Sequence, residues 1–523
     1  MHNWAQKWAT ERPRQYTMTW VTFWNFCSVA QRAIMYGWNV WVEQLFRIFY
    51  GDSEYTMARG GPVFAFSLIS FSMGMGNLII TFTRFQDPNK IFNIFGFKFR
   101  GGRNRTAYII GLIASTISSI LMGLAVQYKQ LWLLYIGCAT FGFFGAGMQP
   151  LNKFAVTMSY YAVGQKGIGS GFSNAWPGVW AASFSYWGTA LSDHLSVQSA
   201  IYIAAAISVV LCLVPIPFSN VVVPNLSKYH QRSKERLELA SELAKTEVMQ
   251  PVALPIAEVL RTPQFWLMWF AFFFMMTPGF GIKYLISPML ANVFDASDSV
   301  QNLASFLFLV LYSFARFLGG ALNWLFDAMI LMRVITFSAV PVLILQGWLA
   351  TQYDSSAALY GFIVCQCIIG MVLGASKVLV TLLWLEVFGA VNYLNSFGIL
   401  LTSWGTASLI GPILGWWSLS GHGLSTDPTY KTDLSNAVAI FCYTSAGALA
   451  VAFLTSFLIK NIDFAKYQHF KEASSSSGDP EEAISGKVSK SSIDESEALL
   501  SQDESELSLR KSLVDAEEVV GAE

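Results

Sequence analysis

The stretch 306-FLFLVLYSFARFLGGALNWL-325 determines how the rest of the chain is interpreted. It is apolar at nearly every position and has about the 20 residues that a helix needs to cross the hydrocarbon core of a bilayer. Its one formal charge is Arg316. A charge near the middle of a span costs about 2.5–3.5 kcal/mol on insertion scales, so it faces protein or a water-filled cavity. Two interpretations stay open: Arg316 snorkels or pairs structurally with a neighbour, or it holds an anion in a translocation path.

Apolar runs of this length recur along most of the chain, which has 523 residues, 54% of them hydrophobic and only 13% charged. Only helices and closed barrels satisfy their backbone hydrogen bonds in lipid, so the pattern predicts an all-α membrane protein. We expect twelve transmembrane helices, at about residues 19–41, 61–83, 107–127, 131–158, 167–190, 197–217, 264–290, 301–325, 334–351, 358–385, 393–417 and 434–459.

The predicted spans fall into two groups of six, separated by polar sequence. Residues 1–18 form a tail, 19–217 a first six-helix bundle (the N-terminal half), and 218–263 a polar linker. A second six-helix bundle follows at 264–459 (the C-terminal half). The Ser-rich and acidic segment 460–523 cannot bury a core, so we expect it to be a disordered tail.

The positions of Lys and Arg between spans predict the orientation in the membrane. Basic residues gather before the first span and in the loops after spans two and six, whereas the opposite loops are acidic or sparse. We therefore expect both termini to be cytoplasmic, in a plasma or endolysosomal membrane. The tail contains an acidic-dileucine pattern, Glu495 with Leu499 and Leu500, which sorting adaptors read; solvated filler is the alternative.

Several classes of function find no support in the sequence. All six cysteines fall inside apolar spans, without the spacing of a disulfide framework or a metal site. No nucleophile–base pair, metal cluster or phosphate loop stands out. We therefore expect neither an enzyme nor a bound cofactor or metal, and no nucleic-acid partner.

One short motif occurs at matching places in the two halves. Lys153, Val156 and Thr157 in the fourth span have the spacing of Lys377, Val380 and Thr381 in the tenth, each followed by a Val and a Gly. The motif alone could arise by chance. Its matching position supports an internal duplication, which is how many transporters are built.

Five basic residues lie within predicted spans: Arg32, Lys153, Lys283, Arg316 and Lys377. The acidic residues nearest to the membrane sit at or near span ends (Glu43, Asp193, Asp327 and Glu386). A buried cationic set without buried acids needs anions from elsewhere or deep water, which points to an anionic substrate. The alternative for each lysine is that its long stem snorkels to the interface, an alternative that weighs less for the more central Arg32 and Lys377.

A sequence that disfavours a regular helix precedes Lys283. Pro278, Gly279 and Gly281 follow one another within the seventh span. Such residues break the backbone hydrogen bonds of a span, and such breaks often line a cavity or act as a gate. A kink without function is the alternative.

The layout of six spans, a long linker and six spans resembles the major facilitator superfamily. Thr262-Pro263 with Phe265-Trp266, and the glycine-rich run from Phe388 to Pro412, are similar to the oxalate–formate antiporter group. Arg316, followed by Gly319-Gly320, resembles the substrate arginine of the eighth helix in that group and in the related monocarboxylate transporters. The resemblance implies that helices one, four, seven and ten surround a cavity, and that three, six, nine and twelve face lipid.

Two positions depart from these relatives. Thr402-Ser403-Trp404 stands where oxalate carriers have a second basic residue, which favours a monocarboxylate over a dicarboxylate unless Lys377 substitutes. Tyr312 stands one turn before Arg316, where proton-coupled monocarboxylate carriers have an aspartate. We therefore expect exchange or facilitated flux rather than proton symport by that route.

The sequence thus predicts a secondary active or facilitative transporter of a small organic anion, working by alternating access. Arg316 would bind the carboxylate, and Lys377 and Arg32 would supply positive potential, with Lys283, Lys153 and Tyr312 as further candidates for substrate contact. A carrier of large neutral amino acids is the alternative substrate class. A receptor with the same fold but no transport is the alternative outside it.

Overall fold

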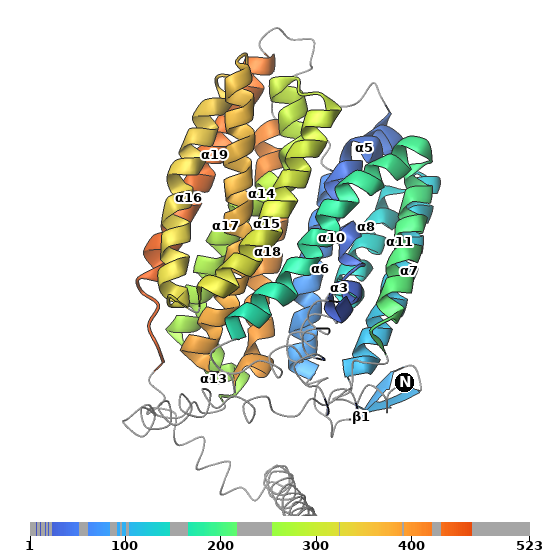
Figure 1. Cartoon of the computed structure of the whole chain (residues 1–523), viewed down its shortest axis with the longest axis vertical. Helices are drawn as coiled ribbons and strands as arrows, with labels where there is room; N and C mark the ends of the chain where they lie inside the picture. Colours follow the sequence, from blue (N-terminus) through green and yellow to red (C-terminus); the bar gives the residue numbers. More distant parts are fainter. Residues whose placement is uncertain are drawn as a thin grey trace, which may run out of the picture. The chain divides into compact units, whose positions relative to one another are not determined.

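The structure is a computed structural model in which the helical part of the chain is described (Figure 1). The described residues are 23–51, 61–83, 91–94, 97–100, 104–146, 166–216, 254–323, 325–389, 392–420 and 430–462, with Lys7, Glu11, Tyr16 and Thr19 singly. The helices belong to one compact unit, Met1–Val248 with Pro255–Ile462. A second unit, Met249–Leu254 with Asp463–Glu523, lies outside the described residues apart from Leu254.

The described elements of the N-terminal half follow the predicted order of spans. They are α3 (Asn25–Ser28), α4 (Arg32–Gly37), η2 (Trp38–Trp41), α5 (Val42–Tyr50), α6 (Gly61–Thr83), β1 (Ile91–Ile94), β2 (Phe97–Arg100), α7 (Asn104–Gln127), α8 (Leu131–Thr140), η4 (Phe141–Ala146), α10 (Lys166–His194) and α11 (Val197–Leu213).

The C-terminal half is built in the same way. Its elements are α13 (Ile256–Arg261), α14 (Pro263–Phe294), α15 (Asp298–Leu322), α16 (Ala328–Ala350), α17 (Ser356–Phe388), α18 (Tyr393–Ser420) and α19 (Tyr430–Ser456). Within the described residues, eight helices are long and apolar enough to cross a membrane, and two shorter apolar helices accompany them. The less apolar α10 and the interrupted first span complete the twelve predicted spans.

The first span departs from the prediction of one helix over 19–41. From Asn25 it consists of short pieces that continue to Tyr50, where Gly51 takes a positive φ of 80° and ends the helix. Ser28 Oγ donates to the Asn25 carbonyl at 2.8 Å. Such local side-chain bonds offer the backbone an alternative to the helical ladder. The structure thus divides the predicted first span into short helical pieces.

Two further features were not predicted. Strands β1 and β2 form an antiparallel hairpin with Ile91 opposite Arg100, in the long loop that follows α6. Helix α16 begins six residues before the predicted span, so it includes Arg333. Its Nη2 donates to the Ser456 carbonyl at 3.0 Å, at the end of α19.

The exposure of the helices agrees with the arrangement that the resemblance implies. In their most apolar windows, 78% of the residues of α17 and 67% of those of α14 are buried, against 33% in α16 and 50% in α7 and α19. The tenth and seventh spans are thus interior helices, and the ninth, third and twelfth have outward faces.

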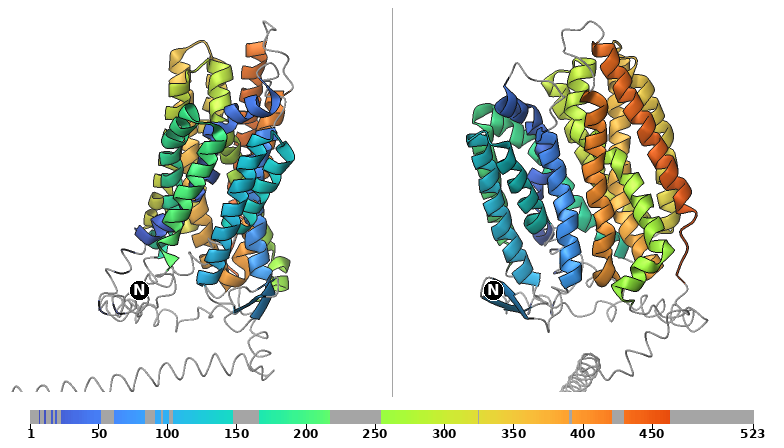
Figure 2. Two further views of the ribbon diagram at one scale, coloured as in Figure 1. Left: turned by 90° about the vertical axis from the view of Figure 1, so that its right-hand side faces the viewer. Right: turned by 180° about the vertical axis from the view of Figure 1, so that it is seen from behind.

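The two halves meet along two pairs of helices (Figure 2): α6 packs against α18, and α10 against α15. Glycines make both contacts close. A Cβ on Gly74 of α6 would lie 3.2 Å from the Cα of Gly405 on α18. A Cβ on Gly178 of α10 would collide with the Oγ of Ser313 on α15. Small residues at such crossings let helices in a membrane protein approach closely.

Candidate functional site

Arg316 is buried on α15 at the contact between the halves. Its side chain is 1% exposed, and its Nη1 donates to the backbone carbonyl of Asn174 on α10 at 2.7 Å. The guanidinium carbon lies 3.9 Å from the ring centroid of Tyr312, one turn earlier on the same helix. The arginine that the sequence singled out therefore has an aromatic face on one side and touches the opposite half on another.

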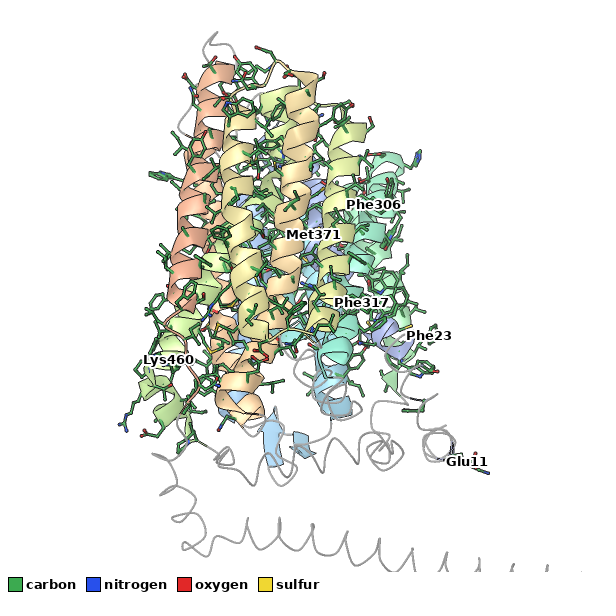
Figure 3. The ribbon with its side chains drawn as sticks, turned by 60° about the vertical axis from the view of Figure 1, so that its left-hand side comes forward. Glu11, Phe23, Phe306, Phe317, Met371 and Lys460 are labelled. Carbon is green, nitrogen blue, oxygen red and sulfur yellow. The ribbon has the colours of Figure 1, made fainter. Side chains whose placement is uncertain are left out.

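The helices around Arg316 are held close by three glycines. A Cβ on Gly171 would lie 3.0 Å from the Arg316 carbonyl, and one on Gly374 of α17 would lie 2.1 Å from the carbonyl of Tyr312. Gly178 occupies the same contact about two turns further along α10, beside Ser313. Two ring pairs extend it, Phe172 with Phe317 at 4.6 Å and Tyr186 with Phe306 at 4.7 Å. Figure 3 labels Phe306 and Phe317 on α15. The position of Arg316 is thus fixed by α10 and α17 together.

Lys283 is the second cation at this level of the bundle. It lies on α14, is 2% exposed, and interacts electrostatically with Arg316. Its Nζ lies 4.7 Å from the ring centroid of Tyr284. Burial and a like charge nearby both disfavour the ammonium form of a lysine, so an anion close to Lys283 would stabilise its charge.

Lys377 is a half-buried cation on α17 with an aromatic neighbour on another helix. Its Nζ lies 4.3 Å from the ring centroid of Trp404 on α18, a side chain that is 1% exposed. Thr381, from the duplicated motif, donates its Oγ1 to the Lys377 carbonyl at 3.1 Å. The motif residue Lys153 and its surroundings lie outside the described residues. Only the copy of the motif on α17 is therefore described.

Arg32 begins α4 and is also buried, at 4% exposed. It interacts electrostatically with Tyr108 of α7, whose hydroxyl donates to the Cys212 carbonyl of α11 at 2.9 Å. Arg32 is thus buried within the N-terminal half, near Tyr108.

The predicted gate residues lie in an unbroken helix. Helix α14 runs continuously from Pro263 to Phe294 with Pro278 inside it, where the missing proline N–H removes one hydrogen bond of the helical ladder. A Cβ on Gly279 would lie 2.8 Å from Leu373 of α17, and one on Gly281 would lie 3.0 Å from the Gly411 carbonyl of α18. The glycines thus let three helices pack closely, and a gating role stays a prediction.

A row of aromatic rings crosses from one half to the other, and the sequence did not reveal it. It runs from Trp404 through Phe280, Tyr284 and Phe66 to Trp38, with centroid separations of 5.2, 6.2, 5.6 and 4.2 Å. Tyr284 of α14 also hydrogen-bonds the hydroxyl of Ser70 on α6 at 3.0 Å, and both side chains are buried. The adjacency of Tyr284 to Lys283 was the one available sequence signal.

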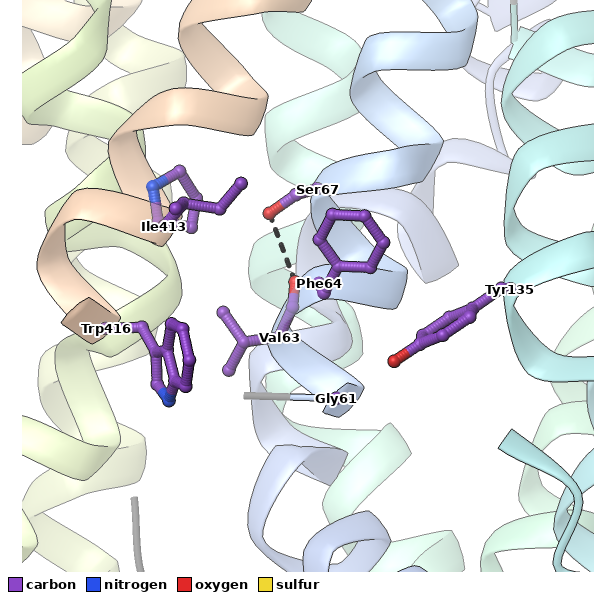
Figure 4. A pocket seen from close by; sticks show the side chains of 8 residues that line it. Gly61, Val63, Phe64, Ser67, Tyr135, Ile413 and Trp416 are labelled. Atoms are coloured by element: carbon purple, nitrogen blue, oxygen red, sulfur yellow. Dashed lines mark hydrogen bonds between the residues drawn. The ribbon is translucent and has the colours of Figure 1, made fainter. Parts of the chain in front are cut away.

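A separate cavity of 340 Å³ lies between α6, α8 and α18 (Figure 4). Its lining is mainly apolar and includes Phe64, Tyr135 and Trp416. No basic residue contributes to its lining, so this cavity does not include Arg316, Lys283 or Lys377.

Metal and thiol chemistry find no site in the described part of the chain. No group of three or more His, Cys, Asp or Glu residues there could hold a metal ion. The six cysteines are buried free thiols. The predicted sorting residues Glu495, Leu499 and Leu500 lie outside the described residues.

The chain is similar to known proteins in its structure. No protein-family model matches it, and no curated protein matches it significantly. The E. coli fucose:proton symporter FucP is similar in structure, with a TM-score of 0.51, 11% identity, and 84% of this chain and 98% of that chain covered. A bacterial homologue of the human lysosomal transporter Spinster, in an inward-facing and unoccupied conformation, has a TM-score of 0.55 and 14% identity, covering 86% and 98%.

These likenesses define the fold. The chain has the all-α fold of the major facilitator superfamily transporters, as the sequence predicted. The resemblance to the oxalate–formate antiporter and monocarboxylate transporter group stays a prediction.

Proposed function

We propose that this protein is a secondary active or facilitative transporter that moves a small organic anion, in the first instance a monocarboxylate, by alternating access. The observation that carries the proposal is the buried guanidinium of Arg316 at the contact between the halves, 2.7 Å from the Asn174 carbonyl. A substrate bound there touches both halves, which is what coupling of binding to their movement requires.

Arg316 suits a carboxylate better than it suits a structural role alone. A guanidinium carries five N–H donors in a planar fork, and a carboxylate accepts two of them in parallel. The Asn174 carbonyl accepts from one nitrogen. In our proposal the substrate carboxylate accepts hydrogen bonds from the guanidinium in the bound state. The hydrogen bond to the Asn174 carbonyl orients the side chain when the site is empty.

The neighbouring cations support an anionic substrate. Lys283 and Arg316 interact as like charges within the membrane-spanning part of the bundle. An anion placed near both is attracted by the Arg316 guanidinium and stabilises the charged form of Lys283, which burial alone disfavours. In this proposal Lys377, Arg32 and Lys153 contribute positive potential. The ring of Tyr312 packs against the Arg316 guanidinium.

An amino acid is the alternative substrate class. Its carboxylate would bind Arg316 in the same way. Its ammonium group, however, would need a hydrogen-bond acceptor in a site surrounded by basic residues. Backbone carbonyls could supply one, as the Asn174 carbonyl already does for Arg316. The charge balance of the spans favours the anion.

Uptake by vesicles separates these alternatives. Purified protein is reconstituted into liposomes, and the initial uptake of labelled formate, acetate, lactate, oxalate, benzoate, leucine and phenylalanine is compared with protein-free liposomes. We expect saturable uptake of at least one monocarboxylate, inhibited by other monocarboxylates. Uptake of the amino acids alone would replace the substrate class, and the absence of saturable uptake together with anion binding would favour a receptor.

The placement of the protein in the cell is also part of the proposal. Basic loops put both termini in the cytoplasm, with the acidic-dileucine pattern available to a sorting adaptor at a plasma or endolysosomal membrane.

A further inference from the structure

We propose that Trp404 is a positioning residue, which holds the ammonium group of Lys377 in place for the anionic substrate. The inference rests on the proposed function and adds a residue to its site. The Lys377 Nζ lies 4.3 Å from the centroid of the Trp404 ring. That ring forms a T-shaped contact with Phe280, at a centroid distance of 5.2 Å and an interplanar angle of 78°, and Trp404 is 1% exposed. Its position is therefore fixed by packing, not by the lysine.

In an anion carrier, an aromatic face can stabilise a half-buried ammonium group without neutralising its charge, which a carboxylate cannot do. The negative face of an indole attracts an ammonium, and the attraction grows as water is excluded. The ring is neutral, however, so the positive charge of the lysine remains available to a substrate. A carboxylate partner would cancel that charge. The sequence has no Asp or Glu in the middle of its spans, which agrees with this division of labour.

Trp404 differs from the rings beside Arg316 and Lys283 in where it comes from. Tyr312 and Tyr284 lie on the same helices as Arg316 and Lys283, so they move with them. Trp404 belongs to α18, whereas Lys377 belongs to α17. Helix α18 is held against α14 by close contact, since a Cβ on Gly411 would lie 2.3 Å from the Thr277 carbonyl. The ring thus gives the flexible lysine stem a reference point on a different, tightly packed helix.

A double-mutant cycle tests the proposal. The proteins are wild type, Trp404→Leu, Trp404→Phe, Lys377→Met and the double variant Trp404→Leu with Lys377→Met. Binding of sodium formate, acetate, lactate, oxalate and benzoate is measured on each purified protein by thermal stabilisation, and melting without anion is measured in parallel. Uptake KM and maximal rate follow for the anion that stabilises the wild type most.

We expect Trp404→Leu to raise the dissociation constant and KM about tenfold, equivalent to about 1.4 kcal/mol, with little change in maximal rate. Trp404→Phe should retain most of the affinity because it keeps an aromatic face. In the Lys377→Met background, Trp404→Leu should change affinity less than twofold. Melting without anion should show non-additivity between the two sites, since they are in contact.

Each other outcome overturns a separate claim. An equal loss of affinity in the Lys377→Met background would show that Trp404 acts through packing or touches the substrate itself. If Trp404→Leu binds the anion as the wild type does, and the effects of Trp404→Leu and Lys377→Met on melting are additive, the Trp404 proposal is overturned and the proposed function stands. Non-additive melting without binding of any of the five anions to the wild type would overturn the anion role of both residues, while the contact itself stands.

Discussion

The hydrogen bond between Ser70 and Tyr284 offers a direct test of movement between the halves. It joins α6 to α14 at 3.0 Å, and both side chains are almost fully buried. If the halves separate on this side during transport, the bond must break in every cycle. Tyr284→Phe removes the hydroxyl and keeps the ring that contacts Phe66 and Phe280 at 5.6 and 6.2 Å. The change thus removes the hydroxyl with its hydrogen bond and keeps the ring contacts.

The size of the effect follows from the energy of one hydrogen bond. A buried neutral bond contributes about 0.5–1.5 kcal/mol net, which corresponds to a shift of about twofold to tenfold in a conformational equilibrium. Tyr284→Phe should therefore raise the population in which α6 and α14 have separated by that factor. Ser70→Ala should act similarly, and the double variant should add little to either single change, because the two residues share one bond.

The assay is the alkylation rate of a reporter cysteine by a maleimide. Val63→Cys places the reporter at the cavity between α6 and α18, near the same end of α6, and the native cysteines are buried. We expect each single variant to raise the rate about twofold to tenfold, at unchanged total protein. An unchanged rate, or additive effects of Ser70→Ala and Tyr284→Phe, would refute the assignment of this bond to the movement between halves.

Three other predictions address packing, coupling and sorting. Gly374→Ala should destabilise the protein by about 1–3 kcal/mol in denaturant unfolding, because its Cβ would meet the Tyr312 carbonyl at 2.1 Å; Gly319→Ala, whose Cβ would have 3.4 Å to its nearest neighbour, is the matched control and should be nearly neutral. An imposed pH gradient should not drive concentrative uptake in vesicles that lack internal substrate, since no acidic residue lies deep in the spans; strong accumulation abolished by a protonophore would contradict this. Deletion of residues 476–523 should leave vesicle uptake unchanged and alter the location in cells, and an unchanged location would remove the sorting hypothesis.

Most of the fold could be predicted because the bilayer imposes length and polarity on each span. Helix α17 spans Ser356–Phe388 where 358–385 was expected, and α18 begins at Tyr393 as predicted. The prediction of one continuous first helix was wrong, because the segment from Asn25 to Tyr50 consists of short pieces, and average hydropathy does not register such interruptions. Helix α14 continues through Pro278, and Gly279 and Gly281 beside it allow close packing against α17 and α18, which a local sequence pattern does not indicate.

The site could be predicted only in part. Arg316 was found from the cost of burying a charge, and its burial is confirmed. Its partner Asn174 lies 142 positions away in the chain, so no local pattern indicates the contact. The pairing of Lys377 with Trp404 likewise depends on the packing of α17 beside α18. Sequence reasoning identifies which residues are costly in a membrane, whereas tertiary packing decides what stabilises them.

The role of Arg316 in substrate binding is the central claim, and uptake by Arg316 variants tests it most directly. Initial uptake of the preferred anion is measured in liposomes containing equal amounts of wild type, Arg316→Ala, Arg316→Lys and Lys153→Ala, with thermal stabilisation by the same anion as a binding check. We predict that Arg316→Ala abolishes both signals and that Arg316→Lys lowers uptake about tenfold to hundredfold, because lysine keeps the charge but loses the planar fork. Lys153→Ala should have a milder effect. Near wild-type uptake by Arg316→Ala, with undiminished stabilisation by the anion, would contradict the account and leave Arg316 as a structural tie to Asn174.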